Sequence, residues 1–248
     1  MQSLEQRRAL VTGASAGIGA ATARALAHAG AEVTLLARRR ERLAEVAQEC
    51  AGARIAVADV RDAAAVARAI GSDPFDIVVA NAGLALGVDR LPGGSPDEWR
   101  TVIDTNVNGV LNVLHAALPA MVARGHGDVV VLGSVAGRQV YPGGAVYCAS
   151  KHAVRALYEG LRLDLAGSGL RFATIDPGLV GGTEFSPTRM RGDLEKAKAV
   201  YAGIEPLQAE DIAEIIVFVV SRPARVNIGE VVVWASAQAS TTVVTRKS

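Results

Sequence analysis

The chain has 248 residues, and half of them are hydrophobic, which is enough to bury a substantial core. Its 26 basic and 25 acidic residues give a net charge of +1, so neither a nucleic acid nor an anionic membrane is expected as the main partner. Cys50 and Cys148 lie far apart without metal-type spacing, which argues against a disulfide framework and a cysteine-rich metal site. Residues 1–8 do not resemble a signal peptide, and the longest aliphatic runs are far shorter than a membrane span. We therefore expect a cytoplasmic protein that holds no metal.

Short apolar runs alternate with alanine-rich helical stretches along the whole chain. Strands are expected at residues 9–11, 33–36, 55–58, 77–79, 129–132, 172–175 and 231–234. Helices are expected at residues 18–28, 40–50, 63–70, 96–123, 145–166 and 209–220. Continuous apolar runs are typical of strands that are covered on both faces. The pattern predicts an α/β protein: a three-layer, doubly wound Rossmann fold with a seven-stranded parallel sheet, in a single domain over residues 1–248.

Two connections are longer than the alternation requires. Residues 81–95 and about 181–207 follow expected strand ends and are punctuated by glycine and proline. Ligands of doubly wound folds bind at the carboxyl ends of the strands, so we expect these segments to wall a substrate pocket, with 181–207 as its lid. The alternative is that both are merely long surface loops.

A glycine-rich turn follows the first expected strand and precedes a helix. Gly13 would permit a tight turn, while Gly17 and Gly19 would let a pyrophosphate approach the backbone at the amino end of that helix. A glycine-rich turn need not bind anything, but the strand before it and the helix after it favour a dinucleotide site.

The end of the second expected strand indicates which dinucleotide would bind. Ala37 occupies the position where NAD-binding proteins tend to carry an acid, and Arg38, Arg39 and Arg40 follow. A guanidinium suits the extra phosphate of NADP, so we expect NADP, although Arg40 also suits a solvated helix start. After the third strand, Asp59 and the adjoining Val60 would cap the adenine, or the aspartate would simply begin a helix.

Tyr147 and Lys151 are four residues apart in an expected helix, so both project from the same face. Moving a hydride to or from a carbonyl carbon also requires a proton donor or acceptor at the oxygen. Free tyrosine, with a pKa of about 10, is too weak for this at neutral pH, and a nearby ammonium lowers that pKa. Many helices carry this spacing by chance. Ser134, which follows the strand at 129–132, adds a hydroxyl that would face the same pocket.

Taken together, these motifs resemble the short-chain dehydrogenase/reductase family over nearly the whole chain. The matches are Thr12-Gly13-x-x-x-Gly17-x-Gly19, Asn81-Ala82-Gly83, Asn106, Ser134, Tyr147-x-x-x-Lys151 and Pro177-Gly178. Several short motifs in the right order are far more specific than any one of them. Many members have two successive asparagines where this chain has Ala80-Asn81, a departure that retains the asparagine of the motif.

The resemblance implies a catalytic role for four residues. Tyr147 would be the general acid in reduction and the base in oxidation, and Ser134 would hydrogen-bond the substrate oxygen. Lys151 would lower the pKa of the tyrosine and bind the nicotinamide ribose. Asn106 would lie at a disturbance in its helix and hold a water that links Lys151 to solvent, whereas Asn108 would be structural. The implied cofactor contacts are Gly13, Ser15, Gly17, Ile18, Gly19, Arg38, Arg39, Asp59, Val60, Asn81, Ala82, Gly83, Tyr147, Lys151, Pro177, Gly178, Val180 and Thr183.

A narrower resemblance concerns the two long connections. Residues 81–87, 103–106 and 177–186 are similar to those of NADP-dependent 3-hydroxy acid dehydrogenases, which act on serine, allo-threonine and related acids. The similarity implies a small-molecule substrate with a carboxylate. Arg189 in the expected lid would supply the cation, with Arg138 after Ser134 as the alternative, unless each is an exposed surface arginine.

Two other functions remain open. One is an NADPH-dependent reductase of a larger ketone or aldehyde that is a biosynthetic intermediate. The other is a non-catalytic nucleotide-sensing module on the same fold, although such a protein would not need the four catalytic residues. The helices that carry Asn106 and Tyr147 have apolar positions beyond one stripe, most of which burial against the chain's own sheet would explain. The resemblance implies that the remainder packs against a partner, in a homotetramer or homodimer. The apolar positions are Val110, Leu111, Leu114, Leu118, Leu157, Leu161 and Leu165.

Overall fold

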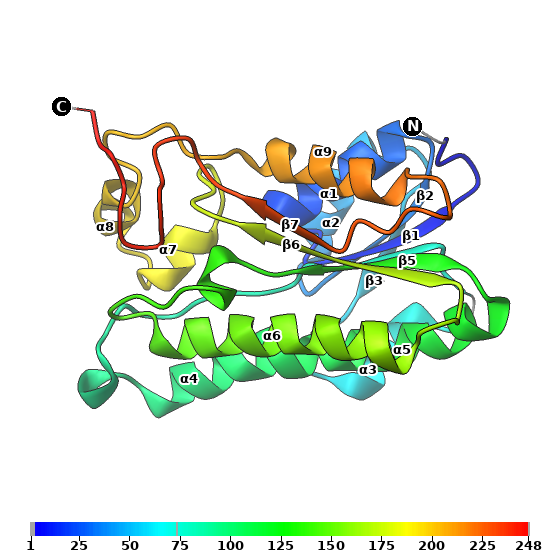
Figure 1. Ribbon diagram of the computed structural model, residues 1–248, viewed down its shortest axis with the longest axis horizontal. Coiled ribbons are helices and arrows are strands. Elements are labelled where there is room, and N and C mark those ends of the chain that lie inside the picture. Colours follow the sequence, from blue (N-terminus) through cyan, green and yellow to red (C-terminus); the bar gives the residue numbers. More distant parts are fainter. Residues whose placement is uncertain (1–2, 73, 248) are drawn as a thin grey trace.

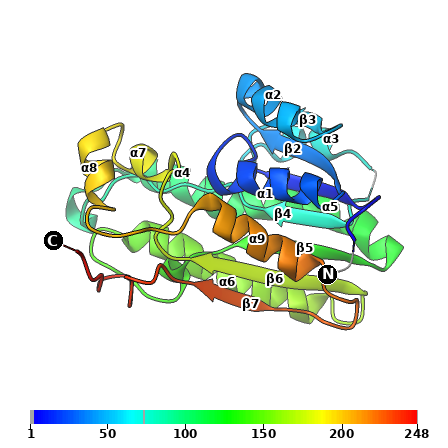
Figure 2. The ribbon, with the colours of Figure 1, turned by 90° about the horizontal axis from the view of Figure 1, so that it is seen from above.

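The computed structural model describes residues 3–72 and 74–247, and within them it contains a seven-stranded parallel sheet. The strands are β1 (Arg8–Thr12), β2 (Glu32–Ala37), β3 (Arg54–Val57), β4 (Ile77–Ala80), β5 (Gly127–Leu132), β6 (Leu170–Pro177) and β7 (Glu230–Val233). Their order across the sheet is β3-β2-β1-β4-β5-β6-β7 (Figure 2). The chain thus runs outward from β1 to β3 and then crosses to β4 beside β1. This is the predicted doubly wound fold, and its crossover point is where such sheets bind nucleotides.

Helices cover both faces of the sheet (Figure 1). One face carries α1 (Gly17–His28), α2 (Arg40–Glu49) and α9 (Ala209–Val220), and the other carries α3 (Ala63–Ile70), α4 (Pro96–Ile103), α5 (Gly109–Arg124) and α6 (Ala145–Asp164). Successive strand residues point to opposite faces, so Val11 packs in the core beneath α1 while Leu10 packs in the core beneath α5. Because both faces of the sheet lie against a core, side chains pointing to either face are apolar.

Local sequence sets where several helices begin. Asp62 accepts a hydrogen bond from the Ala65 amide at 2.9 Å at the start of α3. Ser95 caps α4, whose first residue is a proline and whose first turn holds two acids. At α9 the side chain of Asp211 accepts from the amide of Gln208 at 2.7 Å, as part of a reciprocal capping box.

Two predicted segments differ from the structure. The helix expected at 96–123 is interrupted by a π turn at Asp104–Asn108, which separates α4 from α5. The segment 181–207, expected as a loop, contains two short helices, α7 (Phe185–Arg189) and α8 (Leu194–Ala199). Helices this short bury too little surface to show an apolar periodicity in the sequence.

By length and composition alone, one helical segment in the described residues, Pro96–Arg124, could cross a membrane. In this structure it runs along the sheet, and Val110, Val113 and Leu114 of its second half lie in the core beneath it. The same segment carries Asn106 at its π turn.

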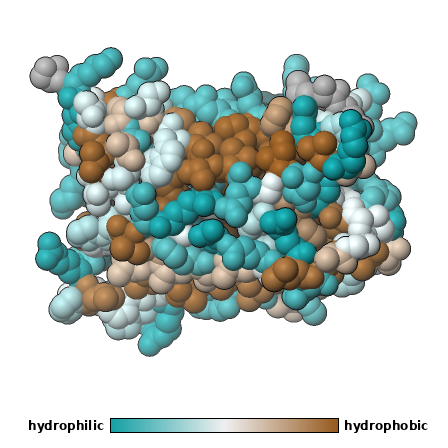
Figure 3. Space-filling model, viewed as in Figure 1, coloured by the Kyte–Doolittle hydropathy of each residue, from teal (hydrophilic) through white to brown (hydrophobic). Residues whose placement is uncertain are grey.

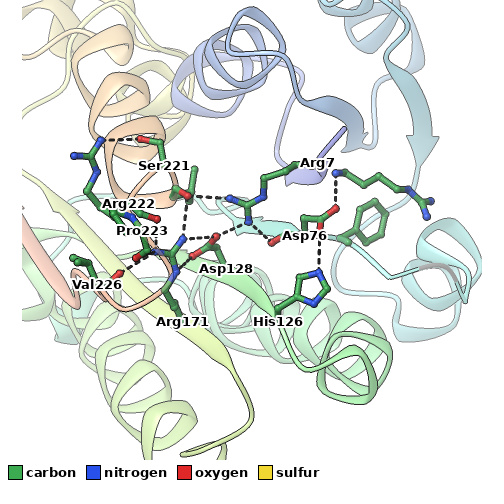
Figure 4. Close-up of polar contacts among 12 residues, drawn as sticks. Arg7, Asp76, His126, Asp128, Arg171, Ser221, Arg222, Pro223 and Val226 are labelled. Carbon is green, nitrogen blue, oxygen red and sulfur yellow. Dashed lines mark hydrogen bonds and ion pairs between the residues drawn. The ribbon is translucent and has the colours of Figure 1, made fainter. Parts of the chain in front are cut away.

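A charged cluster fastens the amino-terminal edge of the sheet (Figure 4). Asp128 of β5 is buried and accepts hydrogen bonds from Arg7 at 2.5 Å and from Arg171 of β6 at 2.9 Å. Both guanidinium groups also donate to the carbonyl of Val220 at the end of α9, and Arg7 donates to the carbonyl of Asp76 before β4. The cluster ties the central strands to α9 at the edge opposite the nucleotide-binding end.

The carboxyl-terminal edge is covered by the segment 181–207, called the lid below. The last residues of the chain run beside it (Figure 1). The amide of Lys247 donates to the carbonyl of Gly203 at 2.7 Å, and Arg246 donates to the carbonyl of Val200 at 3.1 Å. The C-terminal tail therefore braces the far end of the lid.

Candidate active site

A groove opens at the carboxyl ends of β1 and β4. Gly13 and Gly17 have positive φ angles of 67° and 53°. A Cβ at Gly19 would lie 2.4 Å from the carbonyl oxygen of Gly13, so only glycine allows the turn to close against α1. The Asn81 side chain fixes this turn by donating to the carbonyl of Thr12 at 2.8 Å. The turn thus leaves the amino end of α1 uncovered, as a bound pyrophosphate requires.

The groove collects most of the expected cofactor contacts. Its walls include Gly13, Ser15, Gly17, Ile18, Gly19, Arg38, Arg39, Asp59, Val60, Asn81, Ala82, Gly83 and Thr183. Further lining residues that were not expected to contact the cofactor include Leu84, Thr105, Leu132, Glu184, Phe185 and Thr188. Leu84, Thr105, Glu184 and Phe185 lie in the segments that resemble 3-hydroxy acid dehydrogenases, whereas Leu132 and Thr188 belong to no motif.

Two arginines stand at the end of β2, where a 2′-phosphate would lie. Arg38 is largely exposed, with its guanidinium 3.9 Å from the carboxylate of Asp59. Asp59 is held more closely by Arg61 at 2.7 Å, and this hydrogen bond holds the pKa of Asp59 below its usual range. Arg39 donates to both carboxylate oxygens of Glu184, on the lid, and to the hydroxyl of Ser15. The arginines meet the charge requirement of a phosphorylated dinucleotide.

Asn106 lies inside the π turn and is buried. Its amide nitrogen donates to the carbonyl of Leu84 at 2.8 Å and to the hydroxyl of Ser150 at 3.0 Å, and its oxygen accepts from the amide of Leu84 at 2.8 Å. The helix therefore breaks where an asparagine crosslinks it to the β4 loop and to α6. The expected disturbance in the helix is present, and its cause is visible.

Ser134 and Tyr147 meet beyond the end of β5. Ser134 directly follows the strand region and lies near enough to the Tyr147 side chain to influence its pKa. Burial raises the pKa of Tyr147 above its ordinary value, and the nearby Tyr141 adds to the increase. The hydroxyl of Ser134 and the charge of Arg189 act in the opposite direction. The phenol is thus fully protonated at neutral pH in this state of the protein.

Lys151 lies one turn further along α6 and is buried. Its ammonium donates to the carbonyl of Leu132 at 2.7 Å, and burial lowers its pKa to about 8. The charge of Asp176 at the end of β6 partly offsets the effect of burial. Lys151 was expected to lower the pKa of Tyr147, but in this structure its ammonium is directed to a main-chain oxygen. The groups that oppose the raised pKa of Tyr147 are Ser134 and Arg189.

Comparison with known proteins identifies the family. Residues 7–193 match the family model described as short chain dehydrogenase. The chain belongs to the short-chain dehydrogenase family. The resemblance drawn from the motifs is thereby confirmed.

Several relatives of this short-chain dehydrogenase are similar over almost their full length. NADP-dependent 3-hydroxy acid dehydrogenase YdfG of Escherichia coli is 44% identical over 225 residues, which cover 88% of this chain and 91% of the relative. Sulfoacetaldehyde reductase 2 of Chromohalobacter salexigens is 43% identical over 239 residues, covering 93% and 94% of the two chains. Among solved structures, the closed form of a serine dehydrogenase complexed with NADP+ superposes with a TM-score of 0.92 at 40% identity, covering 97% of this chain and all of the other.

In this short-chain dehydrogenase the lid brings an arginine to the tyrosine. Arg189 on α7 lies over the ring of Tyr147 at 5.9 Å and donates to the hydroxyl of Tyr141 at 2.8 Å. Its other hydrogen bonds go to the carbonyls of Gly87 and Gly143, so every acceptor in these bonds is uncharged. A half-buried guanidinium that meets only neutral oxygens is suited to an anion.

Arg138, the alternative cation, has charged partners instead. Its guanidinium donates to the buried carboxylate of Asp176 at 2.7 Å and to Glu230 on β7. Asp176 near the end of β6 and Glu230 at the start of the neighbouring β7 both lie beside Arg138, so two carboxylates neutralise its charge.

Four of the expected cofactor contacts lie at the end of β6 or in the segment that follows it. Thr183 reaches the groove, where a Cβ on Gly17 would touch it at 3.3 Å. Pro177 accepts a hydrogen bond from Ser134 at 3.4 Å, and Val180 pairs with Leu207 across the lid. Gly178 is instead covered by Gln238 of the C-terminal tail, whose side-chain oxygen would meet an added Cβ at 2.3 Å. Thus Thr183 alone of these four lines the groove.

Proposed function

We propose that this short-chain dehydrogenase is an NADP-dependent oxidoreductase that interconverts a secondary alcohol and a carbonyl, acting on short 3-hydroxy acids such as serine or allo-threonine. The observation that carries this proposal is the position of Arg189, a cation with neutral partners placed over the ring of Tyr147. The relatives named for 3-hydroxy acid and serine dehydrogenases support the same substrate class. Arg38 and Arg39 support NADP over NAD.

Each catalytic residue has a separate proposed role. NADPH, when bound in the groove, supplies the hydride for the carbonyl carbon. Tyr147 donates its phenolic proton to the carbonyl oxygen, and in oxidation it accepts the proton of the alcohol. Ser134 hydrogen-bonds the same oxygen and holds it within reach of the phenol. Lys151, whose ammonium is held at the end of β5, binds the hydroxyls of the cofactor ribose. The water proposed for Asn106 stays a prediction.

Arg189 is proposed to bind the carboxylate of the substrate. A planar guanidinium can donate two parallel hydrogen bonds to the oxygens of one carboxylate, which fixes the orientation of a short acid relative to Tyr147. The alternative substrate is an aldehyde that carries a sulfonate, because a relative at 43% identity is named a sulfoacetaldehyde reductase and Arg189 suits either anion. A larger ketone or aldehyde without an acidic group would gain nothing from this arginine.

A substrate profile separates these candidates. Turnover of serine and allo-threonine with NADP+, and of sulfoacetaldehyde and bulky neutral ketones with NADPH, is followed by NADPH absorbance. We expect the hydroxy acids to be turned over and neutral ketones to be poor. Arg189→Met should raise KM for the acids at least tenfold and leave KM for a neutral ketone unchanged. Efficient turnover of bulky ketones alone would refute the proposal for hydroxy acids.

The tyrosine assignment distinguishes an enzyme from a nucleotide-sensing module. Tyr147→Phe removes the proton donor and should lower kcat by about 10²–10⁴-fold. NADPH binding, measured by the fluorescence of the bound dinucleotide, should persist. A variant that retains full turnover would show that another group transfers the proton.

We also propose that the protein acts in the cytoplasm as a homotetramer or homodimer. Of the apolar positions expected at the interface, Val110 and Leu114 are buried in the subunit's own core, while Leu111 is 42% exposed. Figure 3 shows a second hydrophobic surface over α9, where Phe218 is 45% exposed. Burial of these surfaces against a second copy would remove apolar area from water. Light scattering after size-exclusion chromatography measures the mass of the assembly.

A further inference from the structure

An ion pair crosses the cofactor groove. Arg39 Nη1 and Nη2 donate to the two carboxylate oxygens of Glu184 at 3.0 and 2.7 Å, and Nη2 also donates to Ser15 Oγ at 3.1 Å. Arg39 stands at the end of β2, Ser15 on the glycine-rich turn, and Glu184 on the lid just before α7. All three residues line the groove. The Arg39 guanidinium thus connects the end of β2 and the glycine-rich turn to the lid.

We propose that the Arg39–Glu184 pair, called the clasp below, holds the lid shut over the bound dinucleotide and thereby controls how fast the oxidised or reduced cofactor leaves. The inference rests on the proposed binding of NADP. It goes beyond that function because it assigns to Glu184 a role in release that no catalytic motif indicates.

The lid is fastened differently on its two sides. Towards the substrate loop, Arg191 pairs with Asp89 at 2.5 Å and with Glu98 at 2.7 Å, and Arg189 reaches Gly87. These contacts join the lid to the residues that wall the substrate pocket. The clasp lies on the other side, where the lid meets the turn that would hold the phosphates. A dinucleotide leaving the groove must therefore part the clasp, while the substrate-side contacts can remain.

The clasp is weak enough to open in every catalytic cycle. The Arg39 and Glu184 side chains are 44% and 51% exposed, so solvent screens their attraction. Arg39 nevertheless holds the pKa of Glu184 below its usual range, and the carboxylate is charged at neutral pH. Exposed ion pairs stabilise a structure only modestly. Because both carboxylate oxygens of Glu184 are bound, we place this pair near the upper end of the range for exposed pairs, which corresponds to about a two- to fivefold change in the rate of cofactor release.

Glu184→Gln tests the clasp, because it keeps the shape of the side chain and removes its charge. Release of NADPH is measured by stopped-flow fluorescence when excess NADP+ displaces it. We expect E184Q to release NADPH about two- to fivefold faster than wild type in low salt. The ratio should approach one in about 1 M salt, where the screening length falls to about 3 Å. Release of NADH should accelerate by the same factor, since the clasp acts on the lid and not on the 2′-phosphate.

Glu195→Gln is the matched control. Glu195 lies on the same lid, in α8, but among the described residues it forms an ion pair only with Lys198 one turn away, at 3.0 Å. E195Q should release NADPH at the wild-type rate. A second measurement needs no cofactor: amide hydrogen exchange across 181–207 should be faster in E184Q than in E195Q when both are free of ligand.

The outcomes are distinct. Equal release rates in E184Q and wild type would overturn the clasp and leave the proposed function intact. Slower release of NADPH by E184Q would also overturn it, because Glu184 would then be competing with the 2′-phosphate for Arg39. If the wild-type protein fails to bind NADPH, both the proposed function and the clasp are wrong.

Discussion

At the scale of single residues, Lys151 shows how function and stability oppose each other. Its ammonium is buried at the end of β5 and donates a hydrogen bond to the carbonyl of Leu132. Burial lowers its pKa from 10.5 to about 8, so the folded protein holds this charge at a cost near neutral pH. The sequence pattern identified the residue, but nothing in the pattern revealed this cost.

Lys151→Met should therefore abolish turnover and stabilise the protein. At pH 7 we expect the free energy of unfolding to rise by roughly 1–2 kcal/mol, after allowance for the lost hydrogen bond to Leu132. Between pH 8 and 10.5 the unfolded wild type keeps the lysine proton that the folded protein has released, so wild-type stability rises with pH relative to K151M. Urea unfolding from pH 7 to 10.5 measures the difference, and a gap that widened with pH would contradict the argument.

At the scale of elements, the turn between β1 and α1 depends on close backbone contact. Gly19 lies on the first turn of α1, directly against the carbonyl of Gly13, and the Asn81 side chain packs on both glycines. A side chain at Gly19 would have to push two backbone segments apart.

The π turn after α4 also depends on one residue. The side chain of Asn106 bonds to the main chain of Leu84 and thereby sets the shape of this part of the helix.

Gly19→Ala should widen the turn and weaken dinucleotide binding. The added Cβ would lie 2.4 Å from the carbonyl oxygen of Gly13, and relief of this clash should cost roughly 1–3 kcal/mol of stability. We expect KM for NADPH to rise at least tenfold. Gly93→Ala is the control, because an added Cβ there meets no other atom within 4 Å. If both variants behave alike in thermal unfolding and in NADPH titration, the turn is less crowded than the structure indicates.

At the scale of the molecule, the two edges of the sheet are built differently. The carboxyl-terminal edge holds the groove, the catalytic residues and the lid. The amino-terminal edge is tied by buried charges, with Asp128 of β5 between Arg7 and Arg171. The exposed ion pair of the clasp, which can open, thus lies at the carboxyl-terminal edge, and the more buried charge cluster lies at the amino-terminal edge.

Asp128→Asn should destabilise the whole sheet while leaving the site geometry alone. Removing the charge leaves Arg7 and Arg171 facing each other with no carboxylate between them, which should cost roughly 3 kcal/mol. Denaturant unfolding should show an earlier midpoint, with KM for NADPH unchanged in the folded protein. Asp97→Asn is the control: the side chain is 89% exposed and pairs only with Arg100 one turn away. Equal midpoints for the two variants would rule out a structural role for the cluster.

The sequence alone determined the fold and the family, and it marked the residues for which a catalytic role is proposed. It could do so because strands covered on both faces are recorded as continuous apolar runs, and because Gly13, Gly19, Tyr147 and Lys151 belong to motifs of fixed local spacing. The pattern also favoured NADP, through arginines at the end of β2. These features depend on neighbours within one strand, turn or helix.

Only the tertiary structure decided which charged groups are available. The sequence offered both Arg189 and Arg138 as the cation, but only the structure shows that Arg138 meets Asp176 and Glu230 while Arg189 meets neutral oxygens beside Tyr147. The partner of Arg39 is 145 residues away on the lid. Whether a cation is neutralised, and which segments it joins, depends on contacts between distant parts of the chain, and these are set by how the strands and the lid pack.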